Sequence, residues 1–171
     1  MYTTLISVAQ LQALQTSSAP LAVFDCTFDL MNPPAGNAQY AEQHIAGAQH
    51  ADLDKHLATH EAGKSVNGGR HPLPQREAFA AWLQSVGLNN NTQVVVYDRN
   101  GMNYCGRLWW MLKWCGHDAV AVLDGGLQAW GAAGGAVGTG EEHTNAAGNF
   151  ALREPLAKLV DTASVLSLIH I

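Results

Sequence analysis

The chain has 171 residues, of which 47% are apolar, enough for the core of one globular domain and the beginning of a second. Its net charge of −5 and its charged fraction of only 13% make it a poor partner for nucleic acid. No apolar run approaches the roughly 20 residues of a membrane span, and the first ten residues lack the pattern of a signal peptide. Three cysteines without a CxxC pair argue against a disulfide framework, so we expect a cytoplasmic protein with no membrane partner.

Short, continuously apolar runs alternate along the chain with segments of helical spacing. The runs at 21–26, 94–98 and 119–124 are typical of strands covered on both faces in a parallel sheet. The alternation therefore predicts an α/β fold, an open parallel sheet with helices on both faces. The predicted helices, in chain order, are one capped by Ser7, a short one over 38–44 capped by Asn37, one that follows Pro74 and stops at Gly87, one through Leu108 and Cys115 that stops at Gly116, and one after Gly126 that runs to the glycines at 134–135.

Two segments interrupt this alternation. Residues 54–73 have weak periodicity and many turn residues, which indicates a long functional or disordered loop. Residues 134–149 are small and polar, and the sequence that follows predicts a new strand and then a capped helix. The last six residues, LSLIHI, look like translated sequencing adapter, and we leave them out of the fold. We expect a first domain at 1–137, a linker at 138–149, the truncated start of a second domain at 150–165, and an artefact at 166–171.

The turn after the strand at 94–98 is the most informative place for chemistry. Ligands bind at the carboxyl ends of parallel strands, where backbone N–H groups and a helix N-terminus form an anion cradle. A cysteine at the first position of such a loop would act as a thiolate nucleophile. This chain has Asp98 there, whose carboxylate would use the same donors and repel a second anion. The alternative is an ordinary strand–helix turn capped by Asp98.

The three cysteines are expected to be structural. Cys26 ends a strand without a glycine-containing loop after it, and Cys115 lies on an apolar helix face. Cys105 lies in a first helical turn, where the helix dipole would lower its pKa, but it comes too late for the loop. His56 and His60 have the i, i+4 spacing of metal ligands, but no further ligand stands at a matching spacing. We therefore expect no metal and no cofactor.

Several motifs, in order, resemble the N-terminal domain of two-domain rhodanese-type sulfurtransferases, which act on thiosulfate or 3-mercaptopyruvate. The likeness covers about residues 5–137, and Ala46 replaces the proline that is usual in the family. The matching pieces are LAVFDC at 21–26, Tyr40-Ala-Glu-Gln-His44-Ile-Ala-Gly-Ala48, Gly69-Arg-His-Pro-Leu-Pro74, VVVYD at 94–98, Arg107-Leu-Trp-Trp110, Gly116-His117, and Leu123-Asp-Gly-Gly126 with Trp130.

The resemblance implies a rhodanese-like fold and a catalytically silent half of an enzyme. In the family, the catalytic cysteine opens the corresponding loop of the C-terminal domain, and the N-terminal loop usually carries aspartate, which Asp98 matches. The missing C-terminal rhodanese domain would be the partner, and it would take sulfur from a small anionic donor as a cysteine persulfide. The alternatives are a stand-alone pseudo-rhodanese binding module without catalysis and a cysteine phosphatase, against which Asp98 argues.

Three further residues are candidates for the substrate or interdomain cleft. His44 could orient the active site, or it could satisfy the backbone of a turn. Arg70 could guide an anionic donor, or it could be solvated or form an interdomain ion pair. Arg99 could pair with Asp98 or face the partner domain, whereas Arg107 is expected to form a structural ion pair.

Overall fold

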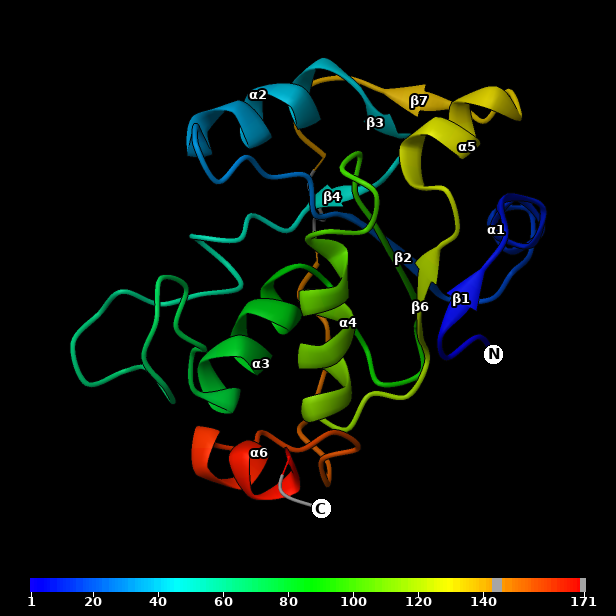
Figure 1. Ribbon diagram of the computed structural model, residues 1–171. Helices are drawn as coiled ribbons and strands as arrows, with labels where there is room; N and C mark the ends of the chain where they lie inside the picture. Colours follow the sequence, from blue (N-terminus) through cyan, green and yellow to red (C-terminus); the bar gives the residue numbers. More distant parts are fainter. Residues whose placement is uncertain (143–145, 170–171) are drawn as a thin grey trace.

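The computed structural model describes residues 1–142 and 146–169. A five-stranded parallel sheet forms its centre, with the strand order β1-β6-β5-β2-β4 (Figure 1). Its strands are β1 (Leu5–Ile6), β2 (Leu21–Asp25), β4 (Gln49–His50), β5 (Gln93–Tyr97) and β6 (Val120–Leu123). A second, small sheet pairs β3 (His44–Ile45) with β7 (Val137–Gly138) in antiparallel orientation.

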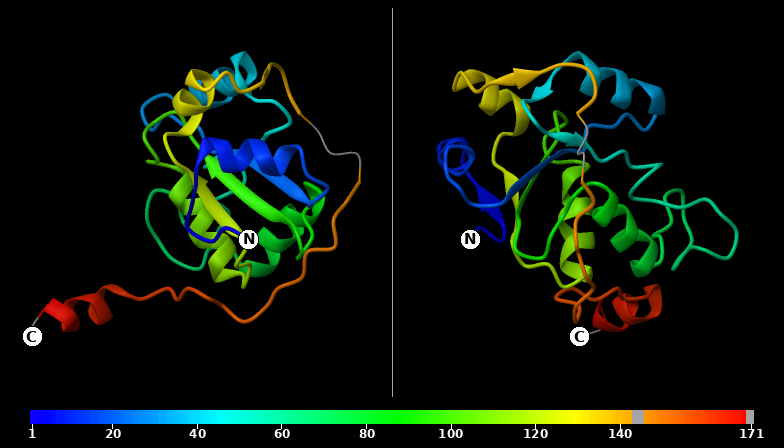
Figure 2. Two further views of the ribbon diagram at one scale, coloured as in Figure 1. Left: turned by 90° about the vertical axis from the view of Figure 1, so that its right-hand side faces the viewer. Right: turned by 180° about the vertical axis from the view of Figure 1, so that it is seen from behind.

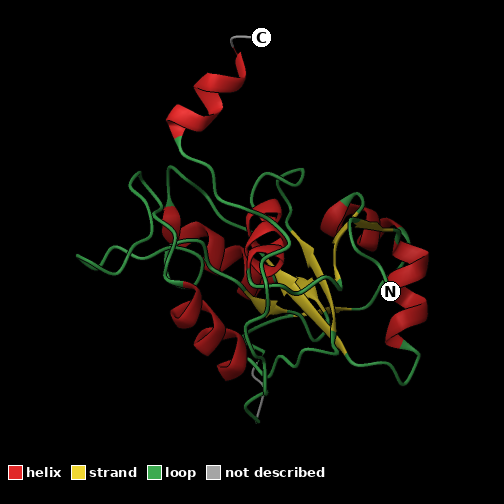
Figure 3. Ribbon diagram, turned by 90° about the horizontal axis from the view of Figure 1, so that it is seen from below, coloured by secondary structure: helices red, strands yellow, loops and turns green. Residues whose placement is uncertain are grey.

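Helices cover both faces of the central sheet, as the view from below shows (Figure 3). Val94 and Val96 of β5 pack into the core with α3 (Arg76–Ser85) and α4 (Cys105–Trp114). Val95 and Tyr97 point into the opposite core, with α1 (Val8–Gln15) and α5 (Gly126–Ala132). Because alternate residues of one strand enter two cores, β5 is apolar from Val94 onward. The predicted fold class is confirmed.

Most of the predicted elements are present. The strands expected at 21–26, 94–98 and 119–124 are β2, β5 and β6. Ser7 caps α1 in a capping box with Gln10. The helices α3 and α4 end before Gly87 and Gly116, whose φ angles of 80° and 81° favour glycine.

The prediction for the second helix was wrong at its start. The helix α2 (Pro33–Glu42) begins before Asn37, because prolines at its first positions fit a helix N-terminus. Asn37 therefore lies inside α2, and its side-chain oxygen lies 3.1 Å from Nδ1 of His50. The four two-residue strands were also missed, since two residues show no period. One of them, β7, includes Gly138, the first residue of the expected linker.

The strand expected after residue 149 is absent, and residues 146–156, which we call the strap, lie instead as an extended segment on α3 and α4 (Figure 2). Phe150 is fully buried in the core on that side of the sheet. The Phe150 N–H donates to the carbonyl of Leu88 at 3.1 Å, and the Leu156 N–H donates to that of Lys113 at 2.9 Å. These contacts bind the strap to the first domain along its length.

The chain continues beyond the strap into α6 (Thr162–Ile169), which projects from the rest of the molecule (Figure 2). The Asp161 carboxylate accepts a hydrogen bond from the Ser164 N–H at 2.7 Å, so the expected capped helix start is confirmed. Of the six residues read as an artefact, 170–171 lie outside the described residues. Within 1–142 and 146–169, no helix is long and apolar enough to cross a membrane.

Candidate functional site

The carboxylate of Asp98, directly after β5, is surrounded by backbone donors. Oδ1 accepts hydrogen bonds from the N–H groups of Asn100 at 2.8 Å and Met102 at 2.9 Å. Oδ2 accepts from those of Tyr104 at 2.8 Å and Cys105 at 3.0 Å. The Asp98 residue is 2% exposed. All four bonds are charge-assisted, so the loop has the anion cradle that the sequence predicted, with its own side chain as the anion.

The conformation of the loop turns these N–H groups inward. Gly101 and Met102 have φ angles of 72° and 68°, the left-handed region that a bulky side chain rarely adopts. The N-terminus of α4 supplies the last two donors. A negatively charged side-chain atom at position 98 is therefore stabilised. A carboxylate at this position cannot form a persulfide, which needs a thiolate sulfur.

None of the three cysteines has the environment of a nucleophile. All three are buried and form no disulfide. Burial, followed by the neighbouring Cys105 and acidic side chains, raises the pKa of Cys26 well above its usual value. Burial raises the pKa of Cys115 to about 11. Burial and the Asp98 carboxylate also raise the pKa of Cys105, so the expected lowering by the helix dipole was wrong.

His44 is fully buried in β3. Its Nδ1 donates to the Tyr40 carbonyl at 2.9 Å, and its ring stacks on that of Tyr40 with 4.2 Å between centroids. Its Nε2 lies 3.7 Å from Oε1 of Glu142. These contacts are those of a packed histidine, and its role at a cleft stays a prediction.

The two candidate arginines both bind backbone carbonyls. Arg99 donates through Nη2 to the carbonyls of Gln39, at 2.8 Å, and Gln43 at the end of α2. It does not pair with Asp98, whose oxygens the backbone occupies. Arg70 is exposed and donates to the carbonyl of Leu30, before α2 begins. The structure therefore places Arg99 beside His44 and places Arg70 at the other end of α2.

Arg107 was expected to form an ion pair, and that prediction was wrong. Its guanidinium donates to the carbonyl of Leu57 at 3.0 Å and 2.7 Å and to that of His71 at 2.9 Å. Burial lowers its pKa. Arg107 therefore fixes the fold of the long loop at 54–73 from its position on α4.

Sequence reasoning missed a carboxylate–imidazole pair in that loop. Nε2 of His71 lies 3.2 Å from Oδ1 of Asp54, and Nε2 of His60 lies 3.5 Å from the same oxygen. The His71 ring meets Phe28 edge-on at 6.0 Å, and Phe28 meets Tyr104 in the same way at 5.7 Å. The pair is thus linked by packed rings to the loop that begins at Asp98. No local pattern signals it, because the residues are far apart in an aperiodic loop.

The geometry of this pair suits the control of a proton. Burial lowers the pKa of His71, against the opposing effect of the Asp54 carboxylate. The carboxylate orients the ring through Nε2, and Nδ1 has no hydrogen bond within the described residues. The contact with Asp54 therefore fixes the orientation of the ring.

The histidines considered as metal ligands do not converge. His56 accepts a hydrogen bond at Nδ1 from the Asp52 N–H at 3.0 Å and stacks on Trp82 at 5.1 Å. His60 faces Asp54 instead. In the described residues, no group of three or more acidic, histidine or cysteine side chains is placed to hold a metal.

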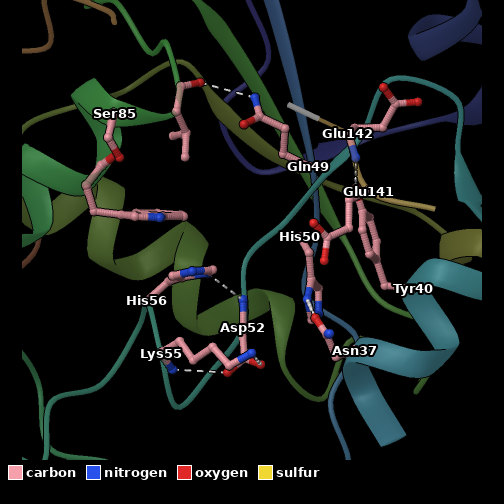
Figure 4. Close-up of a pocket in the computed structure, with 12 residues that line it drawn as sticks. Asn37, Tyr40, Gln49, His50, Asp52, Lys55, His56, Ser85, Glu141 and Glu142 are labelled. Atoms are coloured by element: carbon pink, nitrogen blue, oxygen red, sulfur yellow. Dashed lines mark hydrogen bonds and ion pairs between the residues drawn. The ribbon is translucent and has the colours of Figure 1, made fainter. Parts of the chain in front are cut away.

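A pocket of about 400 Å³ lies between α2, α3 and the edge strand β4 (Figure 4). Tyr40, His50, His56 and Trp82 provide its aromatic walls, and Glu141 lies at its rim. It contains neither Asp98 nor His71. This pocket is therefore separate from the cradle.

Comparison with known proteins gives a consistent result. Residues 7–133 match the sequence profile of the rhodanese-like domain. The chain is 42% identical over 158 residues to a probable 3-mercaptopyruvate sulfurtransferase of Pseudomonas aeruginosa, covering 92% of this chain and 55% of that protein. It is 36% identical over 138 residues to a putative thiosulfate sulfurtransferase, SseB, of Mycobacterium tuberculosis, covering 80% of this chain and 47% of that protein. The chain spans about half the length of these relatives.

Solved structures show the same architecture. A 3-mercaptopyruvate sulfurtransferase from Leishmania major superposes with a TM-score of 0.75 at 29% identity, over 91% of this chain and 41% of that one. SseA from Escherichia coli, described as having the rhodanese fold, superposes with a TM-score of 0.80 at 24% identity, over 99% of this chain and 62% of that one. The second likeness supports the fold alone.

Proposed function

The chain belongs to the rhodanese-like domain family, and from that premise we propose that it is the catalytically silent N-terminal half of a two-domain sulfurtransferase. The observation that carries the proposal is the Asp98 carboxylate in the cradle where sulfur transfer needs a thiolate. The raised pKa values of the three buried cysteines support it, because none of them is poised to replace the missing nucleophile. The half-length matches to sulfurtransferases support it as well.

In the proposed whole protein, a cysteine thiolate of the second domain attacks the sulfur that the donor gives up. This is the outer sulfur of thiosulfate or the thiol sulfur of 3-mercaptopyruvate. With thiosulfate, the S–S bond breaks and sulfite leaves. With 3-mercaptopyruvate, the C–S bond breaks and pyruvate leaves after its carbon takes a proton. The cysteine persulfide then passes its outer sulfur to a thiophilic acceptor such as cyanide or a thiol. A cytoplasmic location is part of the proposal, supported by the three cysteines that form no disulfide.

The surface at the carboxyl end of the sheet suits the docking of the second domain. Leu30 and Met31 follow β2, and Met102 lies in the loop after β5, where they are 37%, 90% and 45% exposed. Because β2 and β5 are neighbours, these apolar side chains lie on adjoining loops. We assign the cleft wall to this surface and place the Asp54–His71 pair there as a positioning pair. His44, Arg70 and Arg99 remain candidates for the cleft.

The test uses the protein encoded by the complete reading frame, assayed with thiosulfate and cyanide and, separately, with 3-mercaptopyruvate and a thiol. We expect a second domain with a cysteine-led loop and turnover of at least one donor. We expect His71→Gln to lower kcat/KM by about tenfold or more. The control His60→Gln removes the other histidine at Asp54 and should leave kcat/KM within about twofold.

Turnover by residues 1–165 alone would contradict the assignment. A stop codon soon after Val165 would also contradict it, and it would favour a stand-alone binding module instead.

A further inference from the structure

The chain leaves the first domain through residues 139–142, which we call the exit segment. It follows β7 and crosses the end of α2. The Gly140 N–H donates to the carbonyl of Ala41 at 2.7 Å, and the Glu142 N–H donates to the hydroxyl of Tyr40 at 3.2 Å. Figure 4 shows Glu142 above Tyr40 at the rim of the pocket. These contacts set the direction in which the chain continues.

His44, beneath the exit segment, has a buried ring nitrogen that no described residue hydrogen-bonds. Its Nδ1 lies 2.9 Å from the carbonyl of Tyr40, and since a carbonyl only accepts, Nδ1 carries the hydrogen. In the neutral ring, Nε2 is then a bare acceptor. It is buried and has no hydrogen bond to residues 1–142 or 146–169, and it lies 3.7 Å from the Glu142 carboxylate, which is also an acceptor. The neutral form therefore places two acceptors face to face.

A second proton on the imidazole reverses this interaction. Nε2–H becomes a donor, and a cation faces the carboxylate of Glu142. The histidine is fully buried and the Glu142 side chain is 41% exposed, so solvent screens the attraction in part, less than it would between two open surface charges. His44 belongs to β3 and Glu142 to the exit segment. A stronger attraction between the two side chains therefore holds the exit segment more firmly against β3.

We propose that His44 and Glu142 form a proton-operated latch, which pins the exit segment to the end of α2 when His44 is protonated and releases it when His44 is neutral. The latch concerns the direction of the chain as it leaves the domain. It does not depend on the proposed catalytic role.

The charged groups near His44 have opposing effects on a second proton at its ring. Glu142 on the exit segment is the carboxylate that faces the ring of His44, at 3.7 Å. The carboxylates of Glu141 and Asp25 act on the hydroxyl of Tyr40, whose ring stacks on that of His44. Arg99 of the loop after β5, bound to the carbonyl of Gln43, opposes the second proton.

The remaining titratable neighbours of His44 do not compete with Glu142 for its Nε2. Burial raises the pKa of Tyr40 on α2 and of Tyr97 on β5, so both hydroxyls stay neutral. His50 of β4 also stacks on Tyr40, at 4.8 Å, but its ring nitrogens face Asn37 and the carbonyl of Thr27. The positive charge of a protonated His44 would therefore be balanced by the carboxylate of Glu142.

Amide hydrogen exchange tests the latch in the intact chain. The N–H groups of Gly140 and Glu142 report the closed exit segment, because both are hydrogen-bonded only while it is docked. After correction for intrinsic exchange, we expect the protection of both N–H groups to be about tenfold higher at pH 5 than at pH 8. The N–H of Val95 in β5 serves as the internal reference for global unfolding.

Two variants separate the pair from a general effect of charge. Glu142→Gln keeps the size and the backbone of the latch but removes its charge, and its protection should not change with pH. Glu141→Gln makes the same change one residue away and should behave like the unaltered chain. A flat response in the unaltered chain, a pH response that survives in Glu142→Gln, or an equal loss in Glu141→Gln would each overturn the proposal.

Discussion

At the scale of single residues, the central feature is the buried carboxylate of Asp98 in a loop whose backbone donors suit an anion. The four N–H groups around Asp98 would be unsatisfied if the loop held no anion. Donors inside the fold that lack a partner are costly, so the carboxylate holds the loop in shape. In our proposal, it does so at the position where sulfur transfer would need a thiolate.

Removing this carboxylate should destabilise the protein. We expect Asp98→Ala to lower the free energy of unfolding by about 3 kcal/mol, because one buried and three part-buried N–H groups lose their acceptor. Asp98→Asn keeps one acceptor oxygen and should lose about half as much. Urea unfolding, followed by tryptophan fluorescence, measures both. A loss below about 1 kcal/mol in Asp98→Ala would show that the cradle does not depend on the carboxylate.

The site could be predicted from the sequence where one short segment contains all of its parts. The cradle is such a case, since Asp98 and its donors lie within one turn. The Asp54–His71 pair is not, because a long loop without periodicity brings the two residues together. The pKa of Cys105 was misjudged because burial and a neighbouring carboxylate exceed the helix dipole, and neither can be read from its position in the helix.

At the scale of elements, strands and helices with a full apolar period were predictable. The strands β2, β5 and β6 are buried on both faces, and their β-branched and apolar runs are unmistakable. The strap was not predictable, because its place depends on a few long-range contacts. Asn90, for example, both donates to and accepts from the backbone of Ala151, at 2.9 Å and 2.7 Å. Such pairing leaves no period in the sequence.

The anchor of the strap should contribute strongly to stability. Phe150 is fully buried, and its ring lies 5.8 Å from that of His117. We expect Phe150→Ala to cost about 3 to 5 kcal/mol, the range for a buried phenylalanine. Leu156→Ala, at a side chain that is 56% exposed, should cost less than about 0.5 kcal/mol. Urea unfolding of the two variants decides whether the strap belongs to the first domain or is a loose linker, for which both losses would be small.

At the scale of the whole molecule, the chain has the fold of a sulfurtransferase domain and about half the length of its relatives. Exposed apolar side chains, such as Met31 and Met102, lie in the loops at the carboxyl end of the sheet, which also hold Asp98. The strap runs from the C-terminal end of α3, at Gln84, to the C-terminal end of α4, at Lys113 (Figure 2). In the proposed whole protein, this domain would form one side of the interdomain cleft, and the second domain would carry the catalytic cysteine.

Intact-mass spectrometry after incubation with thiosulfate or 3-mercaptopyruvate tests the account most directly. Because position 98 offers a carboxylate and all three cysteines are buried, we predict that this chain gains no sulfur atom from either donor. A gain of one sulfur atom that cyanide removes, and that disappears when Cys26 or Cys105 is changed to serine, would contradict it.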